Sequence, residues 1–494
     1  MSYIQFLGAA GTVTGSKHLF SFSGSSSGSE RVQVLVDCGL FQGKKEWRER
    51  NWQPLPLNAQ EIDCLILTHA HLDHCGWIPR LVKQGFRGPI YATPATIDLC
   101  GILLPDSGHL QEEDAAFHNK KKTSRHNPAL PLYTMEEAQA SMQYFQAVEF
   151  GETIQISPEV SFRFVHAAHI LGSSMAELTL RIARPGGPAP PSEASVAQGG
   201  LAATRVLFTG DIGRVHDQHL APGKVVYSGP QAGEAVDVVV MESTYGNRRH
   251  PTEDPRPTLA RLIQNTVERG GSVVVPAFAV ERTQKFLFML KELMESGQAP
   301  RVPVYCDSPM AIKAVEIFLK HREEYSDVTK QLISRYGSPL AWQGFHFALT
   351  TEESKKINQS KFPGIIVSSS GMVTGGRIQH HLAQRLPDPR NTVIFIGFQA
   401  PGTRGFRIKS GEPEVKIFGE MVPIRAKIAA LEQFSDHADT PELLEWLGTF
   451  QHKPRATYLV HGEPEATSQL QSAMANELGW NVQIAQWMQK VDVP

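Results

Sequence analysis

Short apolar runs that end at turns dominate the first half of the chain. Some alternate apolar and polar residues, which is typical of strands with one buried face, and others are continuously apolar. The predicted strands cover residues 3–7, 32–37, 62–68, 90–93, 161–166, 176–182, 206–211 and 235–241. Many short strands with few helices indicate packed sheets whose rims carry the functional residues. We expect the Ser/Gly-rich segment 21–30 to be a hairpin loop and 184–204 to be a surface insertion.

The hydrophobic pattern changes near residue 248, where predicted helices begin to alternate with predicted strands. Helices are predicted over residues 255–269, 281–295, 310–322 and 378–386, and strands over 272–276, 302–306 and 364–368. Such alternation is typical of a parallel, doubly wound sheet. After about residue 434 come predicted helices over 441–448 and 465–478 and predicted strands over 456–461 and 481–485.

Length and composition exclude several classes of protein. At 494 residues the chain exceeds a single core, so we expect two or more domains. A net charge of −2 gives no general attraction for nucleic acid, so any such surface must be local. The sequence shows no secretory leader and no run near the ~20 apolar residues of a membrane span, so we expect no membrane partner.

The five cysteines are scattered, odd in number and without C-x-x-C pairs. This distribution favours reduced thiols over a disulfide framework. We therefore expect a cytoplasmic protein.

Possible metal ligands are most concentrated in the segment His-Ala-His-Leu-Asp-His, where a continuously apolar predicted strand ends. Its His69, His71, Asp73 and His74 are all metal-ligand types. Imidazole and carboxylate at this density suit Zn²⁺, with Mn²⁺ as the alternative. His69 and His71 alternate and could grip one metal, while Asp73 and His74 face a second. The alternative is a solvated polar loop whose histidines have no function. Further acidic residues and a histidine at the ends of later predicted strands make this alternative less favoured.

Taken in order, these residues resemble the signature of the metallo-β-lactamase superfamily, H-x-H-x-D-H. Asp37 matches the family's first motif, an aspartate that buttresses the metal loop from behind, and His169 and Asp211 match the third and fourth motifs. The resemblance implies two zinc ions, with the carboxylate of Asp211 bridging them. The implied ligands are His69, His71, His169 and Asp211 for one ion, and Asp73, His74, Asp211 and His461 for the other.

Three further residues resemble motifs A, B and C of the β-CASP branch, the nucleic-acid-processing nucleases of this superfamily. They are Glu242 in Val-Met-Glu-Ser-Thr, His437 in Phe-Ser-Asp-His, and His461 in Leu-Val-His-Gly. In that branch a histidine at motif C accompanies RNA-processing members, such as bacterial and archaeal ribonucleases and the pre-mRNA 3′-end cleavage subunit. An aliphatic residue is usual in DNA-repair members.

The resemblance also implies the architecture. It is an α/β protein, a metallo-β-lactamase αββα sandwich with an inserted doubly wound parallel-sheet β-CASP domain. The expected domains are residues 1–246 for the first part of the sandwich, 247–433 for the insertion and 434–494 for the rest of the sandwich. The active site should lie in the cleft between sandwich and insertion.

A Gly/Ser-rich turn within the expected insertion follows the strand at 364–368. Converging backbone N–H groups and a helix amino terminus can hold an anion there. It resembles a phosphate-gripping loop of β-CASP enzymes, although a plain structural turn is the alternative. The predicted phosphate- and RNA-binding residues are Ser369, Ser370, Gly371, Gly375, Gly376 and Arg377. Residues 307–311 form a second strand-to-helix corner that we expect beside the cleft.

Other basic residues are harder to interpret. The run 120–122 with Arg125 is more typical of a solvated surface than of a nucleic-acid contact. Arg248 and Arg249 directly follow motif A, so they could line the cleft.

The resemblance implies a zinc-dependent ribonuclease that hydrolyses single-stranded RNA by a two-metal hydroxide mechanism. In it Asp73 orients the nucleophile, His437 stabilises charge or donates a proton, and Glu242 holds a nearby histidine. Because the chain ends soon after His461, with no further domain, we expect endonucleolytic cutting. The alternatives are a DNA nuclease, a hydrolase of small esters or thioesters, and a non-catalytic RNA-binding subunit. A homodimer is the expected assembly if the chain is not monomeric.

Overall fold

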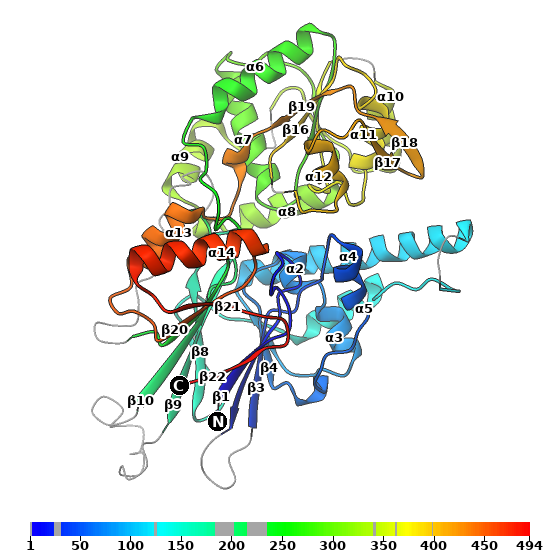
Figure 1. The fold of residues 1–494 in the computed structure, drawn as a ribbon. Coiled ribbons are helices and arrows are strands. Elements are labelled where there is room, and N and C mark those ends of the chain that lie inside the picture. The colour runs from blue at the N-terminus through cyan, green and yellow to red at the C-terminus, as the bar shows by residue number, and fades with distance from the viewer. Residues whose placement is uncertain are drawn as a thin grey trace.

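The computed structural model describes residues 2–23, 31–122, 126–182, 202–214, 235–338, 342–360, 363–397 and 399–494. Two lobes are visible in Figure 1. The lower lobe, as drawn there, contains both ends of the chain, and the upper lobe contains the middle of the sequence. The two predicted surface loops fall largely outside the described residues, at 24–30 and 183–201.

Two sheets of seven strands face each other in the lower lobe. The first contains β1 (Ser2–Phe6), β2 (His18–Ser23), β3 (Arg31–Val36), β4 (Cys64–Ile66), β5 (Ile90–Ala92), β6 (Phe145–Ala147) and β22 (Lys490–Val493). The second contains β7 (Thr153–Gln155), β8 (Val160–His166), β9 (Ser174–Ile182), β10 (Ala202–Phe208), β11 (Val238–Met241), β20 (Ala456–Leu459) and β21 (Val482–Ile484). Their orders are β22-β1-β2-β3-β4-β5-β6 and β21-β20-β11-β10-β9-β8-β7.

Strand alternation divides the apolar side chains of each sheet between two cores. Val34 and Val36 of β3 pack in the layer between the sheets with Phe162 and Phe164 of β8. Leu35 points the other way, into a core that helices cover. The sheets are therefore buried on both faces, which explains why several strands read as continuous apolar runs.

Helices complete the sandwich on both outer faces. Those on the side of the first sheet are α1 (Lys45–Arg50), α2 (Leu72–Cys75), α3 (Ile78–Lys83), α4 (Pro94–Lys121) and α5 (Met135–Ser141), with short helices η1 (Ala59–Glu61) and η2 (Met142–Tyr144). Those of the second sheet are α13 (Thr440–Leu447), α14 (Pro464–Ala473) and η5 (Met474–Leu478). Trp446 and Leu470 pack from these helices against Leu207 and Val239. The predicted αββα sandwich is confirmed.

The expectation of few helices in the first half of the chain is wrong. The longest helix, α4, spans 28 residues and projects from the lobe in Figure 1. Pro105, Gly101 and Gly108 interrupt its sequence, so its apolar residues show no clear helical period. Strand β10 also begins at Ala202, inside the segment that the sequence assigned to a surface insertion.

The upper lobe is built on a six-stranded sheet of order β14-β13-β15-β12-β16-β19, in which every described pair is parallel. Its strands are β12 (Val273–Pro276), β13 (Val304–Cys306), β14 (Phe345–Phe347), β15 (Ile365–Ser368), β16 (Thr392–Phe395) and β19 (Lys427–Ala430), beside a hairpin of β17 (Glu414–Ile417) and β18 (Glu420–Pro423). Its helices are α6 (Pro255–Glu268), α7 (Arg282–Glu295), α8 (Pro309–Lys320), α9 (Asp327–Tyr336), α10 (Thr351–Gln359), α11 (Ile378–Arg385) and α12 (Arg404–Lys409), with η3 (Arg322–Glu324) and η4 (Glu432–Phe434).

Helices cover both faces of this sheet. Leu259 of α6 and Leu290 of α7 pack on the face that carries Val273 and Val275. Val274 points to the opposite face, where it meets Leu382 of α11. The doubly wound parallel sheet predicted from the strand–helix alternation is confirmed. The chain leaves the second sheet after β11 and returns to it at β20, so the upper lobe is inserted between two neighbouring strands.

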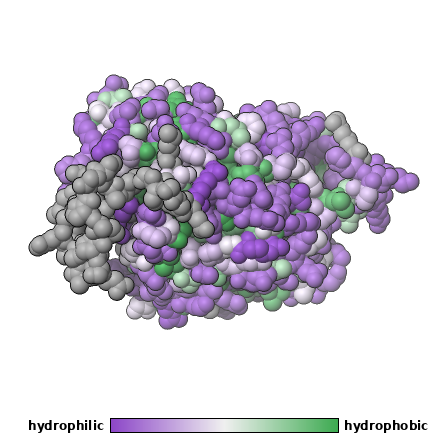
Figure 2. Space-filling view, turned by 90° about the horizontal axis from the view of Figure 1, so that it is seen from below, coloured by the Kyte–Doolittle hydropathy of each residue, from purple (hydrophilic) through white to green (hydrophobic). Residues whose placement is uncertain are grey.

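Viewed from below, the surface is mostly hydrophilic, with apolar residues scattered over it (Figure 2). Among the described residues no helix is both long enough and apolar enough to cross a membrane. All five cysteines are buried and unpaired.

Gly39 couples the end of β3 to the histidine-rich loop. A Cβ atom built on Gly39 would lie 1.6 Å from the Asp73 carbonyl oxygen and 2.6 Å from the His74 nitrogen. Because both contacts are backbone, Gly39→Ala must displace the loop, and we expect it to lower the free energy of unfolding by about 1–3 kcal/mol. Chemical denaturation measures this loss. Gly101→Ala is the control: it adds a Cβ where nothing lies within 4 Å, and should be neutral or stabilise α4 by up to about 1 kcal/mol. Equal stability of both variants would contradict the close packing.

Candidate active site

One rim of the lower lobe gathers the polar residues that follow its strands. His69, His71, Asp73 and His74 lie beyond β4, His169 between β8 and β9, and Asp211 beyond β10. Glu242 directly follows β11 and His461 follows β20 by one residue. Strands β10, β11 and β20 are parallel neighbours, so their carboxyl ends meet at this rim. The structure therefore brings all seven predicted metal ligands together, in two adjacent groups.

The first group contains three histidines and one carboxylate oxygen. His71 Nδ1 lies 3.2 Å from His69 Nε2 and 3.1 Å from His169 Nε2. Asp211 Oδ2 lies 3.6 Å from both Nε2 atoms. All four side chains are buried except His71, which is partly exposed to the cleft.

The second group lies on the other side of Asp211. His461 Nε2 is 3.3 Å from His74 Nε2 and 3.3 Å from Asp73 Oδ2. Asp211 Oδ1 is 3.3 Å from His74 Nε2. Each oxygen of the Asp211 carboxylate thus faces one group.

These spacings fit tetrahedral metal sites. Zinc with Zn–N bonds of about 2.0–2.1 Å holds its ligand atoms roughly 3.3–3.4 Å apart, close to the separations within both groups. Asp211 Oδ1 is buried and accepts no well-formed hydrogen bond from any described residue. A carboxylate oxygen without a donor is costly to bury, and a cation would satisfy it.

The outer nitrogens of the histidine rings are held in place. His74 Nδ1 lies 2.7 Å from Asp37 Oδ2, His69 Nδ1 lies 3.1 Å from Thr68 Oγ1, and His169 Nδ1 lies 3.1 Å from the Asp436 carbonyl oxygen. Such contacts fix the ring orientation and tautomer of metal-ligating histidines. Asp37 also accepts from the Thr68 backbone N–H at 2.8 Å, which ties the start of the loop to β3.

Burial and charge set protonation states that suit metal binding in the first group, whereas Asp211 and Asp37 raise the pKa of His74 in the second group well above its ordinary value against burial. Burial lowers the pKa of His69 and of His169 well below the ordinary value, and that of His71 to about 4. Burial opposes ionisation of Asp211, but the surrounding histidines hold its pKa well below the ordinary value. Neutral imidazoles around a carboxylate anion are the forms that bind metal.

His437 sits beside the first group without belonging to either. Its Nδ1 lies 3.0 Å from Glu242 Oε2, its Nε2 lies 3.9 Å from Asp211 Oδ2, and its side chain lines the cleft. Burial disfavours the imidazolium, yet Glu242 and then Asp211 outweigh it and raise the pKa of His437. Glu242 is fully buried and also accepts from the Ile212 backbone N–H. The histidine near Glu242, which the sequence left open, is His437.

The cleft above these groups lies between the lobes and measures about 1070 Å³ when the solvent-open space at its mouth is counted. Residues of both lobes line it, among them His71, Asp73, His437 and His461 from the lower lobe and Phe278 and Arg282 from the upper. This placement follows the expectation that the site lies between sandwich and insertion.

The Gly/Ser-rich loop borders this cleft only through Met372. Ser369 and Ser370 bond to other side chains, Ser308 at 2.9 Å and Thr374 at 3.0 Å. Gly371 permits close packing, since a Cβ there would lie 2.4 Å from the Phe278 ring. A Cβ on Gly376, at φ +77°, would meet the Ser369 carbonyl oxygen at 2.9 Å, whereas one on Gly375 would meet nothing within 4 Å.

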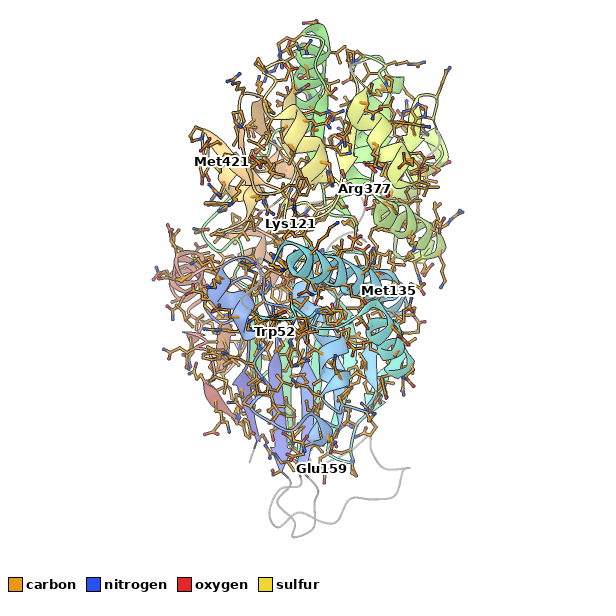
Figure 3. The ribbon with its side chains drawn as sticks, turned by 90° about the vertical axis from the view of Figure 1, so that its right-hand side faces the viewer. Trp52, Lys121, Met135, Glu159, Arg377 and Met421 are labelled. Carbon is orange, nitrogen blue, oxygen red and sulfur yellow. The ribbon has the colours of Figure 1, made fainter. Side chains whose placement is uncertain are left out.

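Arg377, the charged residue of the loop, turns away from the cleft. It lies in the upper lobe (Figure 3), where its Nη1 donates to Asp307 Oδ1 at 2.7 Å and to the Ala348 carbonyl oxygen at 2.8 Å. Asp307 is buried and also bonds His381 at 2.6 Å. The strand-to-helix corner at residues 307–311 thus supports the loop through Asp307. Contrary to the expectation, this corner does not line the cleft.

Sequence reasoning missed Arg282, a buried cation at the start of α7 that lines the cleft. Its Nε donates to Asp436 Oδ2 at 2.9 Å, and Lys285 Nζ donates to Asp436 Oδ1 at 2.7 Å. Asp436 immediately precedes His437, so these ion pairs join the upper lobe to the turn that carries His437. The signal in the sequence was a basic pair, Arg282 and Lys285, near the start of the helix that comes next after strand β12.

The other basic residues that the sequence singled out lie outside the cleft. Residues 120–122 are exposed at the projecting end of α4, where Figure 3 labels Lys121, and Arg125 is outside the described residues. Arg248 and Arg249 line another depression, together with Phe406 and Lys409.

Three family models match the chain in the order of its sequence. The metallo-beta-lactamase superfamily model matches residues 30–95, the Beta-Casp domain model 283–408, and the model of a Zn-dependent metallo-hydrolase RNA specificity domain 421–485. The fold and these three matches thus define a metallo-hydrolase with an inserted β-CASP domain.

Similar proteins cover nearly the whole chain. Ribonuclease TTHA0252 of Thermus thermophilus is 34% identical over 98% of this chain and 99% of its own length. Transcription termination factors FttA are 32% identical in Methanosarcina mazei and 31% in Pyrococcus horikoshii, matching 90% and 85% of this chain but only 66% and 60% of their own length. The chain belongs to the β-CASP family of the metallo-β-lactamase superfamily.

The contact between Asp37 and His74 yields a test. Asp37→Asn keeps a side chain of the same shape at φ +59° but removes the charge that faces His74. We expect zinc affinity about 10–100-fold weaker, because outer partners of ligating histidines contribute that much. Titration with a competing chelator measures the zinc affinity. The control is Asp63→Asn, which lies just before β4, at the end of that strand away from the histidine-rich loop. Unchanged affinity would mean that Asp37 does not orient His74.

Proposed function

We propose that this protein is a zinc-dependent ribonuclease that hydrolyses phosphodiester bonds of single-stranded RNA in the cleft between the lobes. The observation that carries the proposal is the pair of ligand groups joined by Asp211. The RNA specificity domain model and the relative named as a ribonuclease support the choice of RNA. His461 supports it too, because it is the motif C histidine of the RNA-processing members.

The ligand assignment follows the two groups. His69, His71, His169 and Asp211 Oδ2 would hold one zinc ion. Asp73, His74, His461 and Asp211 Oδ1 would hold the second, with Mn²⁺ as the alternative metal. When bound, the ions would acidify water and polarise a phosphoryl oxygen, which are the usual contributions of a two-metal site.

Asp73 and His437 would handle protons on the two sides of the scissile phosphate. The Asp73 side chain is 21% exposed, more than those of Asp211 and His461, and it borders the cleft, so it can accept a hydrogen bond from the attacking water. His437 uses Nδ1 to bind Glu242, which leaves Nε2 facing the cleft. With its pKa raised by the Glu242 and Asp211 charges against burial, the imidazolium can stabilise the phosphoryl oxygens or protonate the leaving oxygen.

Substrate phosphates would meet a positive charge and backbone donors. Arg282 brings a fixed guanidinium to the cleft wall, so we assign to it the charge that the sequence had placed on Arg377. Backbone N–H groups of the loop from Ser369 to Gly376 remain our candidates for a phosphate contact beside Met372. The Arg377 side chain would support that loop through Asp307.

We further propose residues 1–246, 247–433 and 434–494 as the domain boundaries. Strands β11 and β20 lie in the lower lobe on either side of the insertion, and β12 to β19 lie in the upper lobe. We propose a cytoplasmic location because the five cysteines are buried and free. Proteins of oxidising compartments more often carry disulfides. Endonucleolytic cutting and homodimerisation stay predictions.

The proposal is tested by incubating zinc-loaded protein with RNA and DNA of the same sequence, each labelled at one end. We expect internal RNA fragments and little DNA cleavage. A chelator should abolish cutting, and added zinc should restore it. Equal cleavage of DNA would favour a DNA nuclease. Hydrolysis of small thioesters without RNA cleavage would assign the site to another class of hydrolase.

A paired substitution separates chemistry from metal binding. His437→Ala should lower turnover by roughly 10²–10⁴-fold, the range of a positioned acid or base, with zinc content unchanged. His461→Ala should lower zinc content and turnover together, since it removes a ligand of the second group. Elemental analysis and single-turnover rates measure both quantities. Zinc loss in His437→Ala would show that His437 is a ligand, and full activity would show that it only packs the junction.

A further inference from the structure

A ladder of flat side chains extends from the cleft to the outer surface of the lower lobe. The rings of Phe41 and Trp47 lie nearly parallel, with centroids 6.4 Å apart and planes 16° apart. The Arg50 guanidinium lies 4.2 Å from the Trp47 ring and 4.0 Å from the Trp487 ring. Arg50 is thus held between two indoles from opposite ends of the chain.

The inner end of this ladder belongs to the catalytic cleft. Trp47 lines the same cleft as Asp73 and His461. Its neighbour Gly43 abuts the upper lobe, since a Cβ on Gly43 would lie 3.3 Å from the Pro401 carbonyl oxygen. The ladder therefore begins where the two lobes meet and leads outward from the scissile position.

The polar edge of Arg50 is available to an outside partner. Among the described residues its guanidinium makes ring contacts but no hydrogen bond or ion pair. The segment from Lys44 to Arg50 carries four basic and two acidic side chains, and one acid, Glu49, pairs with Lys45 at 3.5 Å. A locally positive surface on a chain of net charge −2 is what single-stranded nucleic acid requires.

The outer end of the ladder is fixed and exposed. Trp487 is 44% exposed, and its Nε1 donates to the Leu7 carbonyl oxygen at 3.3 Å. This anchor keeps the ring in place while one face of the ladder meets solvent. Aromatic rings beside basic groups form the usual platform on which proteins stack unpaired bases.

We propose that Trp47, Arg50 and Trp487 form a subsite for single-stranded RNA flanking the scissile phosphate, in which a base stacks on the exposed Trp487 ring and Arg50, held in place by Trp47, bonds a backbone phosphate. The inference rests on the proposed ribonuclease function and adds to it a path for the strand. We expect RNA long enough to reach the ladder to bind with higher affinity than RNA that is too short to reach it. The subsite would be tolerant of sequence, because every base has a face that can stack.

The test uses full-length, zinc-loaded protein with Trp487→Ala, Trp47→Ala and Arg50→Lys, the last of which keeps the charge but loses the planar group. KM and kcat are measured on end-labelled single-stranded RNAs of five and twenty nucleotides. We expect Trp487→Ala to raise KM for the longer RNA roughly 5- to 150-fold, the loss of one stacked base, with kcat changed less than twofold. KM for the shorter RNA should change less.

Trp52→Ala is the matched control, because Trp52, labelled in Figure 3, is 52% exposed just after α1 and takes no part in the ring contacts that the described residues of the ladder make. Its KM should equal that of the unaltered protein. A lower melting temperature with unchanged KM in the ladder variants would show that the stack only clasps α1, and would overturn the inference. Fluorescence anisotropy with the same RNAs separates the two hypotheses: absence of cleavage despite ladder-dependent binding would refute the ribonuclease and leave the subsite standing.

Discussion

The carboxylate of Asp211 is the group on which the rest of the site depends. It is buried, ring nitrogens of five histidines lie within 4 Å of it, its two oxygens face different ligand groups, and Oδ1 lacks a well-formed hydrogen bond within the described residues. An anion in that position is stable only if positive charge lies next to it. Three parallel strands, β10, β11 and β20, bring Asp211, Glu242 and His461 to one rim, so the sheet topology itself assembles the charge arrangement.

A second carboxylate, Asp436, joins the lobes around this centre. Its side chain binds Arg282 and Lys285 of the upper lobe, while its carbonyl oxygen accepts from His169 in the first ligand group. Breaking one partner of such a buried network costs several kcal/mol, about 3–5 for an ion pair. These contacts therefore link the lobes to the histidines, and His437, the next residue, is held at the wall of the cleft beside Asp211.

Much of this arrangement could be predicted from the sequence, because motifs at strand ends report on topology. His69 to His74, His169, Asp211 and His461 converge as the resemblance to the superfamily and β-CASP motifs implied. Helix α4 escaped prediction because Pro and Gly interrupt its period, and Arg282 and Arg377 could not be placed because the direction of a long side chain depends on tertiary contacts. The ladder of Trp47, Arg50 and Trp487 joins residues 437 positions apart, which no local pattern reveals.

The most direct test of the account is the zinc content of Asp211→Asn beside that of the unaltered protein, with circular dichroism to confirm folding. An amide of the same shape cannot supply the bridging negative charge. We predict close to two zinc ions per chain in the unaltered protein and fewer than one in the variant, because both groups lose a ligand at once. Two zinc ions retained by a folded Asp211→Asn, or a value near zero in metal-replete unaltered protein, would contradict the shared-carboxylate centre.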